Sequence, residues 1–264
     1  MHEAADAAWR VATANLASGR DRRTFRPAFE RLLADLDTLR IDLLGVQEVD
    51  DRLPRSGGID QAAAVAEALR GDGPAWHWHF CAAVHGTPGR RTTMRPAEGS
   101  TPHAPGYGIA LLSRHPVLAW HELRMAPARL AVPVPDEQRV ALAAVVRTPQ
   151  GLATAITTHL SFVPTRAAEQ LRELVRWADA LPRPRVLLGD LNLPGVVAHR
   201  VSGWSPAVRA TTYPAARPAL QLDHIQTDAG PDGVFVRAGA AVPLGRSDHL
   251  ALRADLVIGG RSPA

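Results

Sequence analysis

The chain has 264 residues, of which 46% are hydrophobic, and its mean hydropathy of −0.09 suits a globular protein. It contains no run of about 18 apolar residues, which excludes a membrane-spanning helix, and its single cysteine, Cys81, excludes an intrachain disulfide. All thirty basic residues are arginine; coding bias accounts for this, and a formal charge of +4 is only a weak indication of a polyanionic partner.

The opening residues carry acids where a signal peptide needs a basic and then an apolar stretch, so we expect a cytoplasmic protein. No Gly- or Pro-rich linker divides the sequence, which predicts one domain over residues 1–264.

The first third of the sequence alternates between the two-residue period of strands and the spacing of amphipathic helices. We expect strands at 9–16, 42–49 and 76–84, and helices at 25–36 and 59–69. The stretch from His85 to Pro105 is rich in Gly, Pro, Thr and Arg, which predicts a long loop that is either functional or disordered.

The remaining sequence is richer in strands than in helices. Strands are expected at 107–114 and 115–124, followed by a hairpin in which 139–148 and 152–161 flank Pro149, Gln150 and Gly151. Helical spacing returns at 171–181 and ends at Pro182. Further strands are expected near 185–190, 220–228, 233–242 and 250–258. An irregular proline-bearing stretch follows the strand at 185–190. This pattern favours a layered α and β sandwich over a doubly wound parallel fold.

Polar residues interrupt the apolar strands at or near their expected C-terminal ends. Each alone has an ordinary explanation, as a turn residue, a helix cap, a core histidine or the partner of an arginine. Together they call for one explanation, because buried polar groups must be paired, hydrogen-bonded or bound to a metal. A hard cation would supply it. The residues are Asn15, Glu48, His159, Asp190, Asn192, Asp223, Asp248 and His249.

The motifs that carry these residues are "ANL", "QEV", "GIALLSR", "THLS", "GDLN", "LDHI" and "SDHL". Their order, from about Val11 to Val257, resembles that of the endonuclease/exonuclease/phosphatase superfamily of metal-dependent hydrolases. The resemblance implies a four-layer α/β/β/α sandwich of two mostly antiparallel sheets flanked by helices.

The resemblance also assigns roles to the polar residues. Glu48 would be the main Mg²⁺ ligand, helped by Asn15 and Asp248, with Mn²⁺ as an alternative ion. Asp190 would orient or deprotonate the attacking water, with Asn192 holding the phosphate or that same aspartate. His159 and His249 would grip the phosphate oxygens, and Asp223 would hold the His249 ring. Arg139 would be structural, and the stretch Thr211–Pro218 would shape the site.

The expected function is therefore Mg²⁺-dependent hydrolysis of a phosphoester, most simply by a monomeric phosphodiesterase of nuclease type, with DNA as a candidate substrate. Arg90, Arg91 and Arg95 in the long loop are candidates for nonspecific phosphate contacts, although a disordered loop explains them almost as well. Three alternatives stay open: an enzyme for a small or lipid-headgroup substrate, a non-catalytic binding module on the same fold, and a zinc-binding regulator that uses His77, His79 or other histidines.

Overall fold

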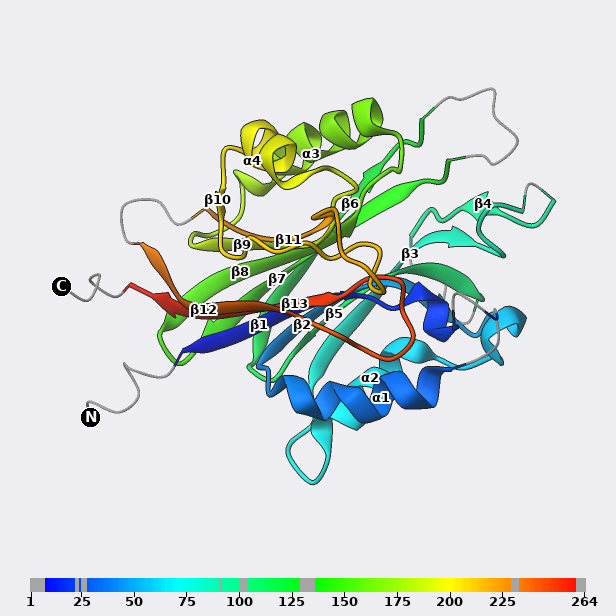
Figure 1. Cartoon of the computed structure of the whole chain (residues 1–264), viewed down its shortest axis with the longest axis horizontal. Helices are drawn as coiled ribbons and strands as arrows, with labels where there is room; N and C mark the ends of the chain where they lie inside the picture. Colours follow the sequence, from blue (N-terminus) through cyan, green and yellow to red (C-terminus); the bar gives the residue numbers. More distant parts are fainter. Residues whose placement is uncertain are drawn as a thin grey trace.

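The computed structural model describes residues 8–21, 24, 28–90, 92–99, 104–128, 136–228 and 233–259. Within these ranges the chain forms two β-sheets that lie face to face (Figure 1). The seven-stranded sheet has the order β12 (Val234–Val242), β13 (Ala251–Ile258), β1 (Trp9–Asn15), β2 (Leu43–Asp51), β5 (Gly106–Ser113), β3 (His77–His85) and β4 (Arg95–Pro96). The six-stranded sheet has the order β10 (Ser205–Pro206), β11 (Asp223–Asp228), β9 (Arg185–Asp190), β8 (Gly151–His159), β7 (Arg139–Thr148) and β6 (Val117–Met125).

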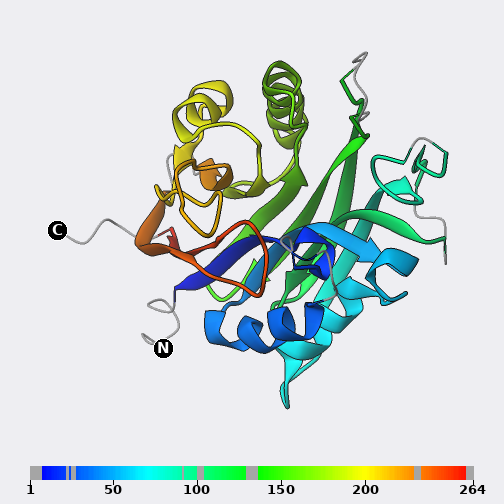
Figure 2. The same ribbon diagram turned by 45° about the vertical axis from the view of Figure 1, so that its right-hand side comes forward.

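Helices cover the outer face of each sheet (Figures 1 and 2). Helices α1 (Phe29–Leu36) and α2 (Gln61–Arg70) pack on the seven-stranded sheet, and α3 (Pro164–Ala178) and α4 (Gly195–Ser202) pack on the six-stranded sheet. Short 3-10 turns lie at η1 (Ala17–Gly19), η2 (Asp37–Leu39) and η3 (Pro54–Ser56). The expected four-layer sandwich is thereby confirmed. No helix within the described ranges is long and apolar enough to cross a membrane.

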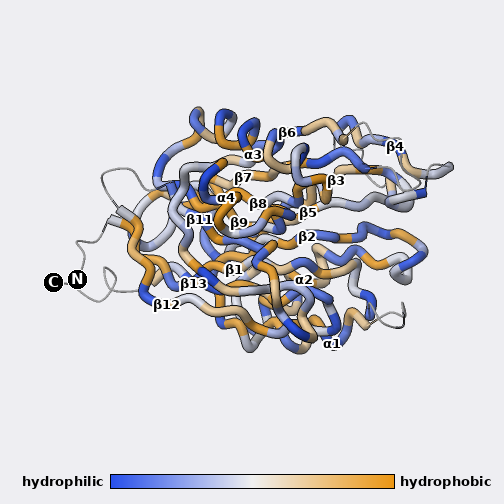
Figure 3. Tube along the Cα trace, turned by 45° about the horizontal axis from the view of Figure 1, so that its top comes forward, coloured by the Kyte–Doolittle hydropathy of each residue, from blue (hydrophilic) through white to orange (hydrophobic). Residues whose placement is uncertain are grey.

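The core between the sheets follows from strand alternation, because every second side chain points inward. Val11, Leu43, Leu142 and Leu188 are among the fully buried residues of this layer, and in Figure 3 apolar stretches run along the central strands. The sheets approach closely at Gly45, where a Cβ atom would lie 2.6 Å from Oγ1 of Thr157. A side chain at Gly45 would therefore force the sheets apart.

Strand pairing is mostly antiparallel, with two parallel exceptions that matter for the site. Strands β1 and β2 run parallel, as do β8 and β9, while β7 and β8 form the expected hairpin with Thr148 opposite Gly151. Parallel neighbours end at the same edge of a sheet. Both parallel pairs therefore deliver strand-end residues to one end of the sandwich.

Helix α4 was not expected from the sequence. It lies in the proline-bearing stretch after β9, starting after Pro194 and ending at Gly203, which has a left-handed φ of 73°. Proline is tolerated at a helix start because the first N–H groups need no intrahelical partner, and glycine favours the left-handed helix end. Val196 and Val197 are exposed, so its sequence lacks a simple amphipathic pattern. Phe25, at the expected start of the first helix, lies outside the described residues.

Candidate active site

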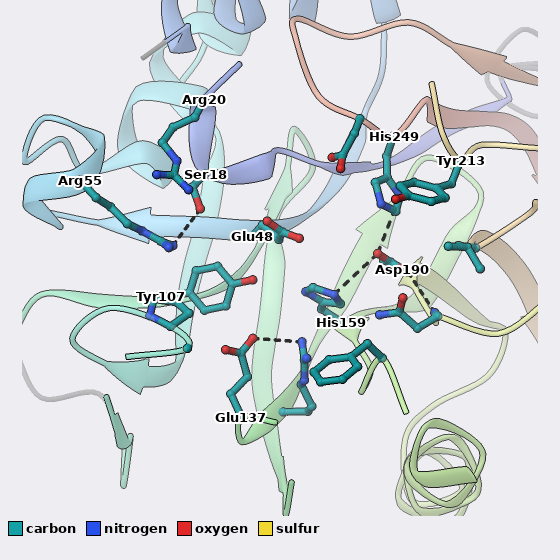
Figure 4. Close-up of a pocket in the computed structure, with 17 residues that line it drawn as sticks. Ser18, Arg20, Glu48, Arg55, Tyr107, Glu137, His159, Asp190, Tyr213 and His249 are labelled. Carbon is teal, nitrogen blue, oxygen red and sulfur yellow. Dashed lines mark hydrogen bonds and ion pairs between the residues drawn. The ribbon is translucent and has the colours of Figure 1, made fainter. Parts of the chain in front are cut away.

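A cavity of about 470 Å³ opens at the end of the sandwich where the two sheets meet (Figure 4). Both sheets and several connecting loops contribute to its wall. We call this space the site cavity. Its lining residues are Ser18, Arg20, Glu48, Arg55, Pro88, Gly89, Tyr107, Glu137, Arg139, His159, Phe162, Asp190, Asn192, Tyr213, Leu222, Asp248 and His249.

The strand ends converge on this cavity by two different routes. In the six-stranded sheet the parallel pair places His159 opposite Asp190. Asp223 was expected at the C-terminal end of a strand, but it begins β11. Because β11 runs antiparallel to β9, this first residue pairs with Asp190, the last residue of β9. The expected convergence is found, although the direction was wrong at Asp223 and also at Asp248 and His249, which precede β13.

Glu48 lies inside β2 rather than at its end. The pairing of β2 with β5 shifts between Val46 and Val49, which marks a β-bulge, and Glu48 has a left-handed φ of 53°. A bulge redirects one side chain and is common beside active sites, and a left-handed non-glycine residue stores strain that the surrounding structure must support. The bulge turns the Glu48 carboxylate into the site cavity.

Asn15 connects Glu48 with the other sheet. Its Nδ2 donates to Oε1 of Glu48 at 3.2 Å and to Oδ2 of Asp190 at 3.1 Å, while its Oδ1 accepts from the N–H of Ala17 at 3.0 Å. Both ends of the amide are thus used inside the protein. This geometry makes Asn15 a support for the two carboxylates.

Asp190 is 1% exposed, and burial is the main reason why its pKa rises to about 7. The negative charge of Asp223 acts in the same direction, whereas His249 and the hydrogen bonds from Asn192 and Asn15 oppose the rise. A carboxyl group with a pKa near neutrality can accept a proton at physiological pH.

His249 and Asp223 form the pair that the sequence predicted. Nδ1 of His249 lies 2.8 Å from Oδ2 of Asp223 and 3.8 Å from Oδ2 of Asp190. Burial by itself would lower the pKa of His249, but the hydrogen bond to Asp223 and the charges of Asp190, Asp223 and Asp248 outweigh it and raise the pKa to about 9. The His249 ring is therefore a cation at neutral pH, and it also packs against Tyr213, with ring centroids 4.9 Å apart.

His159 has the opposite electrostatic character. Burial lowers its pKa well below the usual value, and the charges of Arg139 and His249 lower it further. Its Nε2 lies 3.6 Å from Oδ2 of Asp190, on the far side of that carboxylate from His249 in Figure 4. The two histidines thus flank Asp190 in different protonation states, His159 neutral and His249 charged.

Asn192 is fixed by its own turn. Its backbone has a left-handed φ of 51°, its N–H donates to Oδ1 of Asp190 at 3.0 Å, and its Nδ2 donates to the carbonyl of Leu160 at 2.9 Å. Asparagine tolerates this conformation better than most residues. Asn192 therefore holds Asp190 in place and also faces the site cavity.

Sequence reasoning missed part of the wall. Tyr107, Glu137 and Arg55 line the cavity, and Arg139, expected to be structural, lines it as well. Burial raises the pKa of Glu137, with the charge of Glu48 adding to the rise and Arg139, 3.2 Å away, opposing it. Of these four residues only Arg139, an arginine at the start of an apolar strand, could have been recognised from the sequence. Tyr107, Glu137 and Arg55 reach the cavity only through the tertiary fold.

The oxygen ligands expected for Mg²⁺ are present. Glu48 and Asp248 face the site cavity from different segments, and both are only partly buried. Oδ1 of Asp223 is buried without a hydrogen-bond partner among the described residues, while Oδ2 of the same carboxylate is paired with the His249 ring. Carboxylate oxygens beside open space fit a hard divalent cation that keeps some of its waters.

Asp190, Asp223 and His249 also bring one potential ligand atom each to within 4.8 Å of one another, a spacing that could hold a metal ion. Nδ1 of His249 already bonds Asp223 in this group. The hydrogen bond between His249 and Asp223 accounts for the close spacing of this group without an ion. Within the described ranges this is the one such group. His79 is not part of it and bonds Glu122 at 2.9 Å.

The long loop contacts the site cavity through Pro88 and Gly89. Arg90 and Arg95 are exposed and do not line the cavity wall, and Arg91 lies outside the described residues. Cys81 is buried and burial raises the pKa of its thiol, so it is no nucleophile.

The family model described as Endonuclease/Exonuclease/phosphatase family matches residues 12–251. A search of curated protein sequences finds no match. Among solved structures, an endonuclease/exonuclease/phosphatase from Beutenbergia cavernae is 24% identical, with a TM-score of 0.67 over 96% of this chain and 72% of that chain.

Two other solved structures have the same fold with lower identity. A mannosyl-6-phosphatase from Bacteroides thetaiotaomicron is 13% identical, with a TM-score of 0.64 over 94% of this chain and 99% of that one. The human Nocturnin catalytic domain, which holds a bound sulfate anion, is 17% identical, with a TM-score of 0.63 over 96% and 94% of the two chains. The family model covers nearly the whole described fold and all the strand-end polar residues, so this chain belongs to the endonuclease/exonuclease/phosphatase family.

Proposed function

We propose that this protein is a Mg²⁺-dependent phosphoester hydrolase that also accepts Mn²⁺, and that it uses a water molecule as nucleophile. The observation that carries the proposal is the facing of Glu48, Asp190 and the charged His249 across one cavity. Members of the family hydrolyse phosphoester bonds, which supports the reaction class.

The divalent ion, held by Glu48 and Asp248, would neutralise charge on the phosphate. The side chains of the protein orient the water, accept its proton and bind the phosphate. Asp190, held by Asn15 and Asn192, orients the attacking water and accepts its proton, for which a pKa of about 7 is well suited. No covalent intermediate is needed in this scheme.

The two histidines bind the phosphate oxygens. His249 donates as a cation through its free Nε2, because Nδ1 is engaged with Asp223. His159 donates as a neutral ring. Removing one well-placed donor from such a site raises the barrier by about 3 kcal/mol. Arg139 lies close enough to depress the pKa of His159, while its ion pairs with Asp136 and Glu137 offset its charge.

For the substrate we propose a phosphodiester of nuclease type, with DNA as a candidate and the protein acting as a monomer. A phosphomonoester or a phosphodiester on a small or lipid-headgroup molecule is the second candidate. It is favoured by the size of the site cavity, about 470 Å³, which suits a small ligand, and a mannosyl-6-phosphatase shares the fold.

A screen of the purified protein tests these assignments. It should include plasmid, single-stranded DNA, RNA, bis-p-nitrophenyl phosphate and phosphomonoesters, each with Mg²⁺, with Mn²⁺ and with excess EDTA. We expect turnover of at least one phosphoester that EDTA abolishes. Full activity in EDTA would contradict metal dependence, whereas stoichiometric binding without turnover of any substrate would favour a binding module.

A further inference from the structure

The site cavity continues past Glu48 to an end that the proposed reaction does not use. Figure 4 shows Ser18, Arg20 and Arg55 on one side of Glu48, and His159, Asp190 and His249 on the other. We call the first group, Ser18, Arg20 and Arg55, the arginine end. Ser18 lies in η1 and Arg20 directly after it, in the segment that follows β1. Arg55 lies in η3, which follows β2.

Arg55 is held in one orientation by three hydrogen bonds. Its Nε and Nη2 donate to the two oxygens of Asp50 at 2.8 and 2.6 Å, and Nη2 also donates to Oγ of Ser18 at 2.9 Å. The guanidinium lies over the Tyr107 ring, 5.3 Å from its centroid. Its Nη1 has no hydrogen-bond partner among the described residues. A fixed guanidinium with one unused nitrogen, Nη1, is preorganised to bind a ligand.

Ser18 and Arg20 are directed by a strained turn. Ala17, Ser18 and Gly19 have left-handed φ values of 49°, 56° and 64°, and the turn is tied down by Gln61, whose Nε2 donates to the Ser18 carbonyl at 2.8 Å. Two of these residues are not glycine, so the conformation costs free energy that the surrounding contacts must supply. The turn carries a hydroxyl and an arginine to the wall of the site cavity.

We propose that the arginine end binds a second phosphate of the substrate while the scissile phosphate lies at His159, Asp190 and His249. This inference rests on the proposed function. Arginine and serine donors are suited to phosphate oxygens, because Nη1 of Arg55 offers charged N–H groups and the Ser18 hydroxyl, which accepts from Arg55, still has its own hydrogen to donate. Asp50 offsets the charge of Arg55, and Arg20 brings a second guanidinium to the same end of the site cavity.

A second phosphate with this chemistry can belong to either of two classes of substrate. The second phosphate is either the next phosphate of a nucleotide or strand, or a second phosphate on a sugar. Both place two anionic groups in one cavity. Both predict that a substrate with one phosphate is hydrolysed less efficiently than its counterpart with two.

Matched substrates separate these sources. For nucleotides, thymidine 5′-(p-nitrophenyl phosphate) is compared with the same compound carrying a 3′-phosphate. For sugars, glucose 1-phosphate is compared with glucose 1,6-bisphosphate. The measured quantity is the ratio of kcat/KM for the two-phosphate substrate to kcat/KM for the one-phosphate substrate. A charge-assisted contact of this kind is expected to give a ratio of about ten or more.

Three variants test the residues. Arg20→Gln removes the guanidinium of Arg20, and Ser18→Ala removes the hydroxyl. Arg55→Gln is combined with Asp50→Asn, because Asp50 is fully buried and would otherwise be left without its partner. Arg172→Gln, an exposed arginine on α3, is the matched control. Circular dichroism checks that each variant is folded.

We expect Arg20→Gln and the Arg55 double variant to bring the ratio toward one, by loss of activity on the two-phosphate substrate alone, and Arg172→Gln to leave it unchanged. The substrate pair that shows the effect identifies the source of the phosphate. Hydrolysis of a one-phosphate substrate with a ratio near one in the wild-type protein would overturn the inference and leave the proposed function standing. A ratio that persists in the folded variants would also overturn it. Absence of hydrolysis of every substrate would overturn the proposed function itself.

Discussion

Glu48 occupies a conformation that a glutamate rarely adopts, and it is the residue on which metal binding should depend most. The bulge in β2 and the hydrogen bond from Asn15 hold its carboxylate at the cavity. Exchanging it for glutamine keeps the shape and removes the charge, and hard cations prefer anionic oxygens.

We therefore expect Glu48→Gln to raise the Mg²⁺ concentration for half-maximal activity by about 10- to 100-fold or more, since even supporting residues at metal sites have effects of this size. A titration of activity against Mg²⁺ measures the shift. Glu67→Gln, an exposed glutamate on α2, is the control. An unchanged Mg²⁺ requirement in Glu48→Gln would mean that the ion is held elsewhere.

The hydrogen bond between Asp223 and His249 allows us to predict how the reaction rate depends on pH. Because the pKa of His249 is raised to about 9, the ring stays protonated through neutral pH and loses its proton only as the pH passes that value. In Asp223→Asn the hydrogen bond to a carboxylate is lost, so the pKa should fall and the alkaline limb of the rate profile should move toward acid. Titration of the His249 ring by NMR in the metal-free protein measures the pKa directly.

Double-mutant kinetics test whether the two residues act as a unit. Asp223→Asn should lower the rate at neutral pH by about 10²-fold or more, as expected for a positioned proton donor. Adding Asp223→Asn to His249→Ala should then have little further effect, because residues that act together are not additive. Additive losses would assign Asp223 to the fold.

At the scale of elements, the described part of the long loop between His85 and Pro105 contains regular hydrogen bonds. Its β4 segment pairs with the end of β3, and the N–H of Met94 donates to the carbonyl of Arg90 at 2.8 Å. Pro88 and Gly89 line the site cavity, and the next residue, Arg90, is exposed outside it.

If the substrate is a nucleic acid, replacing Arg90, Arg91 and Arg95 with Ala should flatten the salt dependence of binding by about one unit of log–log slope per lost contact. Fluorescence anisotropy at several salt concentrations measures the slope. The exposed helix residues Arg172, Arg176 and Arg200 provide a control set of equal charge. A slope that is unchanged would favour a small substrate.

The strands were predictable because alternation and apolar runs are local signals. The hairpin between β7 and β8 could be read directly. The helix expected at 171–181 is found as α3, but it spans Pro164–Ala178 and so begins and ends earlier than expected. Helix α4 could not, because it is short and presents exposed valines. The parallel pairing of β1 with β2 was also hidden, since pairing depends on contacts between distant segments rather than on the sequence of either strand.

For the site, the local sequence indicated some of the polar residues but not the backbone geometry that brings them together. Polar residues within apolar strands pointed to Asp190 and His249, and motif order assigned their roles. The bulge that directs Glu48 and the antiparallel pairing that brings Asp223 to Asp190 are properties of the sheets. Arg55 and Tyr107 reach the cavity from segments whose sequences carry no catalytic signal, so only the fold could reveal them.

At the scale of the molecule, the site joins the two sheets. Asn15 of the seven-stranded sheet bonds Asp190 of the other, and the buried side chain of Gln47 bonds Thr13 beside it and Thr157 across the interface. An ion bound beside this interface should stabilise the whole fold, because an ion that binds only the native state shifts the unfolding equilibrium by mass action.

We therefore expect Mg²⁺ or Mn²⁺ at about 100 times its dissociation constant to stabilise the protein by about 2.7 kcal/mol, which corresponds to a rise in Tm of roughly 5–10 °C for a chain of this size. Glu48 and Asp248 lie on different segments, so the variant Glu48→Gln/Asp248→Asn should lose most of this rise while still unfolding in one transition. Differential scanning calorimetry with the ion and with EDTA measures both. An equal rise in the variant and the wild-type protein would show that the stabilising ion binds outside the site cavity, and metal binding at Glu48 and Asp248 would have to be abandoned.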